Sequence, residues 1–229
     1  LSWIHGIHSM KVGADFNVSP EQQQREANFA GVYLFKNLGD YVAALAGDKT
    51  KINRYQQSIA ANGTQGTFSG TQQDHAVFFT DTMRLRRDLT LTAGLRWEAQ
   101  INPQPTTPNP AYPITSKIFN DYRMWQPRLG LAWNVAGKGS TVVRLSAGIF
   151  DSRTPAYLMQ KVFTDNGLNT LVLDTKVDPT VVNFLTVPNR IDTVPNVKLP
   201  LTGFIFGFDP NYKNPRSGQV AFTIEQQLD

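Results

Sequence analysis

The sequence predicts an all-β fold, an antiparallel up-and-down sheet that forms a segment of a transmembrane β-barrel. Three observations predict it: segments in which every second residue is apolar, segment lengths of about ten residues, and connections that are alternately short and long. No apolar run approaches the ~18 residues that a membrane-spanning helix needs. The hydrophobic content of 41% resembles that of a soluble protein, but it does not exclude a barrel, because barrel strands mix lipid-facing apolar residues with interior polar ones.

The period of two is clearest in "LTLTAGLRWEAQ", residues 89–100, where Leu, Leu, Ala, Leu, Trp and Ala alternate with mostly polar residues. Such a segment is an extended strand with one apolar and one polar face. In a soluble sandwich the apolar face would form the core, whereas in a membrane barrel it would form the outer wall. The strand lengths and connections decide between these two possibilities.

The same pattern returns along the chain and predicts about six strands. Each is about as long as a tilted strand must be to cross a bilayer, whereas strands of soluble domains average about five or six residues. Asp81 interrupts the apolar set of the second strand. The expected strands are residues 10–17, 75–85, 89–100, 127–135, 142–151 and 218–228.

The connections alternate strictly between short and long. Two are tight turns, at Arg86–Asp88 and Ala136–Ser140, and three are long loops, at about 17–74, 101–124 and 152–215. Compact soluble domains rarely contain such long loops, but outer-membrane barrels combine short periplasmic turns with long external loops. We therefore expect the apolar faces to contact lipid and the long loops to lie outside the cell.

This arrangement assigns individual side chains to the two faces of the wall. The lipid-facing set is Leu91, Leu95, Leu131, Leu145 and Phe222, and the interior set includes Arg96, Gly130, Arg144 and Thr223.

One helix is expected inside the first long loop. Leu38, Tyr41, Val42 and Leu45 recur at helical spacing, between a possible N-cap at Asn37 and a possible stop at Gly47. Such a helix either packs on the barrel rim or mouth, which is the simpler interpretation, or recognises a partner.

Four segments together resemble one family of membrane proteins. They are "HSMKVGADF", "LTLTAGLRWEAQ", "WQPRLGLAWNVAGKGSTVVRLSAGIFDSRTP" and "NPRSGQVAFTIEQQLD", in this order and with similar spacing. The chain is similar to the barrel of TonB-dependent outer-membrane receptors, and in particular to their Oar-like branch. It departs from the family where residues 80–83 read "TDTM" in place of the usual "QDDW".

The resemblance implies a location in the outer membrane of a Gram-negative cell and a role in transport. Such receptors close about 22 strands around a plug domain, but the sequence shows about six strands, no plug, no TonB box and no terminal aromatic residue. We therefore expect residues 1–229 to be a partial barrel of a longer protein. Expressed alone, this chain is not expected to transport a solute.

Two functions follow from these expectations. The first is a part of a receptor that imports a large nutrient such as a siderophore, a glycan or a peptide. Its partners would be outer-membrane lipid, the unknown large solute and, through the missing N-terminal part, the TonB complex. The alternative is a non-transport outer-membrane scaffold or adhesive surface protein whose long loops bind partners.

The resemblance also gives roles to residues on the two faces. Charged side chains of the polar faces would line the barrel interior, where they contact a plug or a solute, or neutralise one another across strands. These lumen-facing candidates are Lys11, Asp15, Arg96, Glu98 and Arg144. Trp97 and Trp133 lie near strand ends on the apolar face, as interfacial aromatic residues do. The loop aromatics expected to offer a binding surface are Tyr112, Tyr122, Trp125, Tyr157, Phe204, Phe206 and Tyr212.

Other kinds of chemistry find little support in the sequence. The absence of cysteine excludes disulfides and thiolate metal sites, and His5 and His8 have no acidic residue at a supporting ligand spacing. "AGKGST" lacks the full phosphate-binding loop pattern and precedes a strand instead of a helix. We expect no enzyme activity, no cofactor, no metal and no nucleic-acid partner, and the net charge of +4 is mild.

Overall fold

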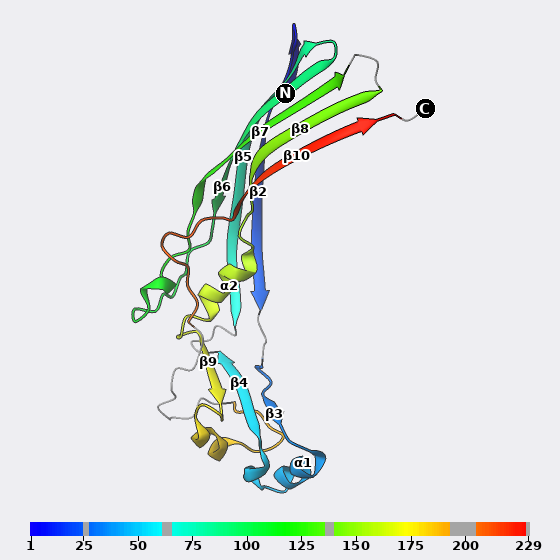
Figure 1. Ribbon diagram of the computed structural model, residues 1–229. Coiled ribbons are helices and arrows are strands. Elements are labelled where there is room, and N and C mark those ends of the chain that lie inside the picture. The colour runs from blue at the N-terminus through cyan, green and yellow to red at the C-terminus, as the bar shows by residue number, and fades with distance from the viewer. Residues whose placement is uncertain (25–27, 61–65, 136–139, 193–204, 228–229) are drawn as a thin grey trace.

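The computed structural model contains one long curved sheet and one small sheet (Figure 1). The small sheet lies at the end of the long sheet that is opposite to both chain termini (Figure 1). The structure describes residues 1–24, 28–60, 66–135, 140–192 and 205–227.

The long sheet has seven strands in the order β1-β2-β5-β6-β7-β8-β10, and every neighbouring pair is antiparallel. The predicted fold class, an antiparallel up-and-down sheet, is therefore confirmed. The sheet is not closed, because β1 and β10 are its two edges. The strands are β1 (Ser2–His5), β2 (His8–Gln24), β5 (Thr67–Arg86), β6 (Leu89–Ile101), β7 (Asp121–Val135), β8 (Thr141–Asp151) and β10 (Arg216–Gln226).

The strand register confirms the two faces that the period of two predicts. Leu91, Leu131, Leu145 and Phe222 are direct cross-strand partners and form one continuous row. Leu95 lies on the same side of the sheet, which we call the apolar face. The other side, the polar face, carries Arg96, Gly130, Arg144 and Thr223.

The strands extend further than the sequence predicted, and the expected loop boundaries at 17–74 and 101–124 were therefore wrong. β2 continues to Gln24 and pairs with β5 from Thr67 onward, and β7 already begins at Asp121. The added residues are largely polar, as in 22–24, so they lack the alternation that an apolar environment imposes. The backbone pairing of β2 with β5 continues through these residues although the apolar alternation has ended.

The strand β1 was also missed by the sequence analysis. Its four residues are too few to show a period of two. Gly6, at a φ of +57°, makes the tight turn into β2, a conformation that glycine adopts at little cost.

The alternation of short and long connections is confirmed. The short connections at Gly6–Ile7 and Arg87–Asp88 lie at one end of the sheet, and the long loops lie at the other end (Figure 1). Most of the second predicted turn, residues 136–139, lies outside the described residues.

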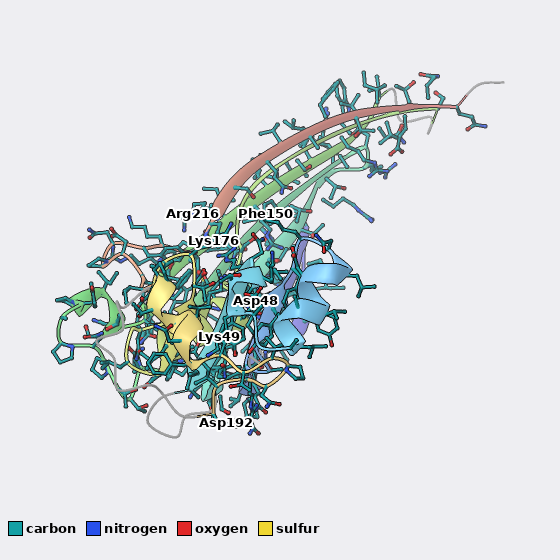
Figure 2. All side chains as sticks on the ribbon, turned by 90° about the horizontal axis from the view of Figure 1, so that it is seen from below. Asp48, Lys49, Phe150, Lys176, Asp192 and Arg216 are labelled. Carbon is teal, nitrogen blue, oxygen red and sulfur yellow. The ribbon has the colours of Figure 1, made fainter. Side chains whose placement is uncertain are left out.

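Parts of the first and third long loops form a compact unit, which we call the loop module (residues 28–60 and 170–192). Its core contains Tyr55, Leu173, Val181, Leu185 and Ile191. Figure 2, seen from the module's end, shows the module in front of the long sheet. Its elements are β3 (Val32–Leu34), α1 (Leu38–Leu45), β4 (Arg54–Ala60), β9 (Thr170–Asp174) and two 3-10 helices, Lys49–Lys51 and Pro179–Phe184. The predicted long loop at 152–215 is thus partly folded.

The helix expected in the first loop is confirmed, but its expected packing on the barrel rim is wrong. Asn37 caps α1 by accepting a hydrogen bond from the Asp40 backbone N–H, and Gly47 follows the helix at a φ of +100°. The helix lies at the far end of the loop module (Figure 1). Leu38 is 75% exposed and Val42 58% exposed, and Ala44 is the one residue of α1 that is buried.

A second helix, α2 (Ala156–Thr164), lies against β5 and β2. It contributes Met159 and Val162 to a second core with Ile118, Phe119 and Phe208, near the short 3-10 helix Pro113–Thr115. Among the described helices, none has both the length and the apolar character needed to cross a membrane.

Candidate functional site

Five charged side chains form a continuous chain of ion pairs on the polar face, which we call the charge ladder. Arg96 binds Asp15 (Nη1–Oδ2, 2.8 Å) and Glu98 (Nε–Oε1, 2.5 Å). Arg153 then contacts Glu98 at 3.8 Å and Asp74 at 3.4 Å. Three of the predicted interior residues are thus brought together and neutralise one another, although Arg96 pairs within β6 and across β5 rather than with a neighbouring strand.

The register explains how these side chains meet. Asp15 and Glu98 lie in the same row of the polar face, separated by Ala76 of β5. The small Ala76 side chain lets the Arg96 guanidinium reach across β5 to Asp15. Ala76 is fully buried as a result.

The sequence analysis missed Asp74 and Arg153. Asp74 fell inside a predicted loop, although it belongs to β5 and pairs with Gln100. Arg153 follows β8 and reaches the ladder only because the third long loop folds back over the polar face. Its presence in the family-like segment "FDSRTP" is the one signal that could have indicated it.

The third loop is fixed to the polar face by a buried network of amides, which we call the loop anchor. The Gln100 side chain is fully buried; it donates to the Thr154 carbonyl (3.1 Å) and accepts from the Thr154 N–H (3.1 Å) and from Asn214 (3.0 Å). Gln72 donates to the same carbonyl and to Asn102, each at 3.1 Å. Side-chain amides of the polar face therefore hydrogen-bond both the backbone N–H and the backbone carbonyl of Thr154.

Apolar contacts support this anchor. Phe163 of α2 packs edge-on against Phe68 of β5, with ring centroids 4.7 Å apart, and Met159 is fully buried. The third loop thus covers the polar face at its loop end.

Toward the short turns the polar face opens into a cavity of about 640 Å³, which we call the polar-face cavity. Its floor consists of small side chains, including Thr80, Thr82, Thr92, Gly94 and Gly130. It is also lined by Phe78 and by three cations, Lys11, Arg96 and Arg128, and no carboxylate of the described residues lines it. Lys11, the fourth predicted interior residue, therefore lies beside the ladder but outside its ion pairs.

Arg144 lies apart from the other predicted interior residues. Its guanidinium pairs with both carboxylate oxygens of Glu225 on β10, at 2.9 and 3.3 Å. Both side chains are about half exposed. This pair joins the neighbouring strands β8 and β10, which is the kind of neutralisation that the simpler interpretation expected.

The two predicted interfacial tryptophans lie at two levels of the apolar face. Trp133 is the direct partner of Leu89, and Trp97 lies eight residues further along β6. At ~3.3 Å per residue and a tilt of ~40°, these levels are about 20 Å apart along the membrane normal, close to the ~25 Å apolar band of a barrel. Each indole N–H has a polar partner: Trp97 donates to the Tyr122 carbonyl (2.8 Å) and Trp133 to Asp88 (3.1 Å).

The apolar face carries the ionisable pair His8–Asp81 at a level between those of the two tryptophans. Asp81 is the direct partner of Met10 and Ala93, which places it on this face. His8 Nδ1 lies 2.6 Å from Asp81 Oδ2. Asp81, the exception in the predicted apolar pattern, is thus paired with His8.

The expected aromatic surface of the loops is only partly present. Tyr122 and Trp125 belong to β7 instead of lying in a loop, and the Trp125 ring lies tilted against that of Trp97, with centroids 6.3 Å apart. Phe204 is outside the described residues. Tyr212 packs in a buried cluster with Phe119 and Phe208, two residues that the sequence analysis did not single out. A cavity of about 450 Å³ lies between residues 113–123 and 208–213.

The part of the chain that the structure describes contains no cluster of three or more His, Asp or Glu side chains that could hold a metal ion. In comparisons with known proteins, no curated protein and no solved structure gives a significant match. A family model described as "Outer membrane beta barrel domain" matches residues 1–229. Membership of that family places the chain in the outer membrane of Gram-negative bacteria. The chain, with its antiparallel sheet of one apolar and one polar face, therefore belongs to the outer membrane beta-barrel domain family.

Proposed function

We propose that the chain forms part of the wall of a TonB-dependent outer-membrane receptor that imports a large nutrient. The observation that carries this proposal is the polar face, where a charge ladder and an open cavity lie below a loop that folds back over the same face. A small barrel fills its interior with side chains, whereas larger barrels enclose channels or plugged interiors. The charged and open polar face fits the larger kind.

The open sheet supports the same proposal. Bare strand edges are not tolerated in the hydrocarbon region of a membrane, so β1 and β10 need neighbouring strands. We propose that further strands complete the wall, as in a barrel large enough for a plug and a passing solute. The external loops would then recognise a siderophore, a glycan or a peptide, and the TonB complex would supply energy through the plug.

A specific observation favours the alternative, an adhesive or scaffold protein. The loop module carries α1 at its far end, with the exposed apolar side chains Leu38 and Val42. Scattered exposed apolar residues are common, but a contiguous apolar helix face is typical of a protein interaction site. Neither proposal includes an enzymatic activity, a cofactor or a nucleic-acid partner.

The experiment that tests the proposal measures uptake in cells that produce the full-length protein. Cells are grown with limiting iron, glycan or peptide sources, and uptake is compared between the parent, a strain without the protein and a strain without TonB. We expect uptake of at least one solute class to require both proteins. Surface binding that is independent of TonB, with no uptake defect for any class, would support the adhesive alternative instead.

A further inference from the structure

We propose that the polar-face cavity binds a small anionic solute through Lys11 and Arg128. The proposal deepens the import function, on which it rests, by naming the chemical class of the solute: a compact anion with several oxygen atoms, such as a polycarboxylate or a phosphate ester.

The charges around the cavity carry the argument. Of its three cations, only Arg96 is neutralised, by Asp15 and Glu98. Among the described residues, neither Lys11 nor Arg128 forms an ion pair with a carboxylate. The Arg128 guanidinium is nevertheless held in place, because it lies 4.8 Å from the centroid of the Phe150 ring and donates to Gln126 at 3.3 Å. The cavity therefore presents two cations that no described carboxylate neutralises, and the guanidinium of Arg128 rests against Phe150 of β8.

The register puts these two cations on opposite sides of one shallow floor. Lys11, Thr80, Gly94 and Arg128 are successive partners across four strands, so the two outer residues are about 14 Å apart at ~4.8 Å per strand. The Lys11 side chain can lean toward a ligand between them, and the Arg128 guanidinium can do so by leaving the Phe150 ring, which lies on the β8 side of Arg128. The floor stays open because the residues between them are threonine and glycine.

The floor also supplies neutral hydrogen-bond donors. Thr80, Thr82 and Thr92 line the cavity, and the Thr82 and Thr92 hydroxyls lie 3.3 Å apart. Hydroxyl groups can donate to anionic oxygen atoms beside the two cations. The cavity volume of about 640 Å³ lies within the range of small-molecule sites, ~300–1,000 Å³.

The depth of the cavity in the wall excludes lipid phosphate as the ligand. Its floor lies between the levels of Trp97 and Trp133, and it opens on the polar face, away from lipid. A cleft lined by charge of one sign and backed by a low-dielectric wall concentrates counter-ions. An anionic solute that enters the barrel interior would therefore accumulate here.

Calorimetric titration of the full-length protein in detergent tests this proposal. The probes are citrate and pyrophosphate, with sucrose as a neutral control. We expect saturable binding of at least one anion, weaker at high salt, and at least tenfold weaker in the double variant Lys11→Gln/Arg128→Gln. The matched control is Arg144→Gln, which removes a cation of the same face outside the cavity and should leave anion affinity unchanged.

A charge-conserving variant, Lys11→Arg/Arg128→Lys, separates lost charge from lost folding and should retain most of the affinity. The proposal is overturned if neither anion binds saturably, or if Arg144→Gln weakens binding as much as the double variant. The titration needs no TonB. Anion binding without TonB-dependent uptake thus contradicts only the proposed import, and uptake without anion binding contradicts only the present inference.

Discussion

The His8–Asp81 pair on the apolar face allows a quantitative test of the barrel-wall assignment. Replacing His8 by Phe leaves the Asp81 carboxylate without its only described hydrogen-bond partner, because Asp81 Oδ1 is buried and unpaired. A hydrogen bond to a charged group contributes about 1.5–3 kcal/mol, and removing one partner of a fully buried pair costs about 3–5 kcal/mol. Since the His8 side chain is 40% exposed and that of Asp81 13%, we expect a cost near the lower range, about 2 kcal/mol.

The double variant His8→Phe/Asp81→Val removes both partners and should recover most of this loss, since an apolar pair suits an apolar face. The assay is urea unfolding of the full-length protein in lipid vesicles, in which about 2 kcal/mol corresponds to a roughly 30-fold change in the unfolding equilibrium. A double variant at least as unstable as His8→Phe would refute the reasoning, because it would show that the carboxylate is well solvated.

Three further predictions concern the wall, the loop module and the loop anchor. A lysine at Leu95 should destabilise the folded protein in vesicles by about 2–4 kcal/mol, and a cost near zero would contradict a lipid-facing Leu95. The hydrogen bond from Arg54 lowers the pKa of Asp174 in the folded protein. The ionised Asp174 therefore stabilises the loop module fully at a pH above its unfolded pKa, and this stabilisation is lost as the pH falls through the folded pKa. Proteolysis of the module should therefore accelerate in acid, and Asp174→Asn should remove this dependence; an unchanged acid response in Asp174→Asn would count against the pair. Gln100→Leu should release the third loop, so that protease added to intact cells cuts residues 153–164 faster; an unchanged cleavage rate would show that other contacts hold the loop.

Much of the long sheet could be predicted from the sequence because the membrane imposes a strict pattern. The prediction for residues 89–100 differs from β6 by one residue, and all six long strands were found. Where the strands leave the apolar band, as β2 does toward Gln24, the pattern ends while the pairing continues. The predicted strand boundaries failed there for that reason.

The candidate site could be predicted only in part. Period-two arguments put Lys11, Asp15 and Arg96 on one face, and the up-and-down order makes consecutive strands neighbours, but neither gives the register that brings Asp15 level with Ala76 and Glu98. The Asp15–Arg96 pair exists because β5, contributed by a later segment, lies between β2 and β6 and offers a small alanine at the crossing point. Arg153 depends on how a long loop folds, and loop residues follow no periodic rule that would have placed it.

The sheet of the loop module joins segments that are far apart in the chain. β4 pairs with β9, so that Gln56 and Asp174 are neighbours although 118 residues separate them. During synthesis, the β3–β4 hairpin must wait until β5, β6, β7 and β8 have been made before its third strand emerges. Contacts of such high sequence separation form slowly. The pairing of β9 with β4 should therefore be a slow step of folding, because it closes a longer stretch of chain than any strand pair of the long sheet does.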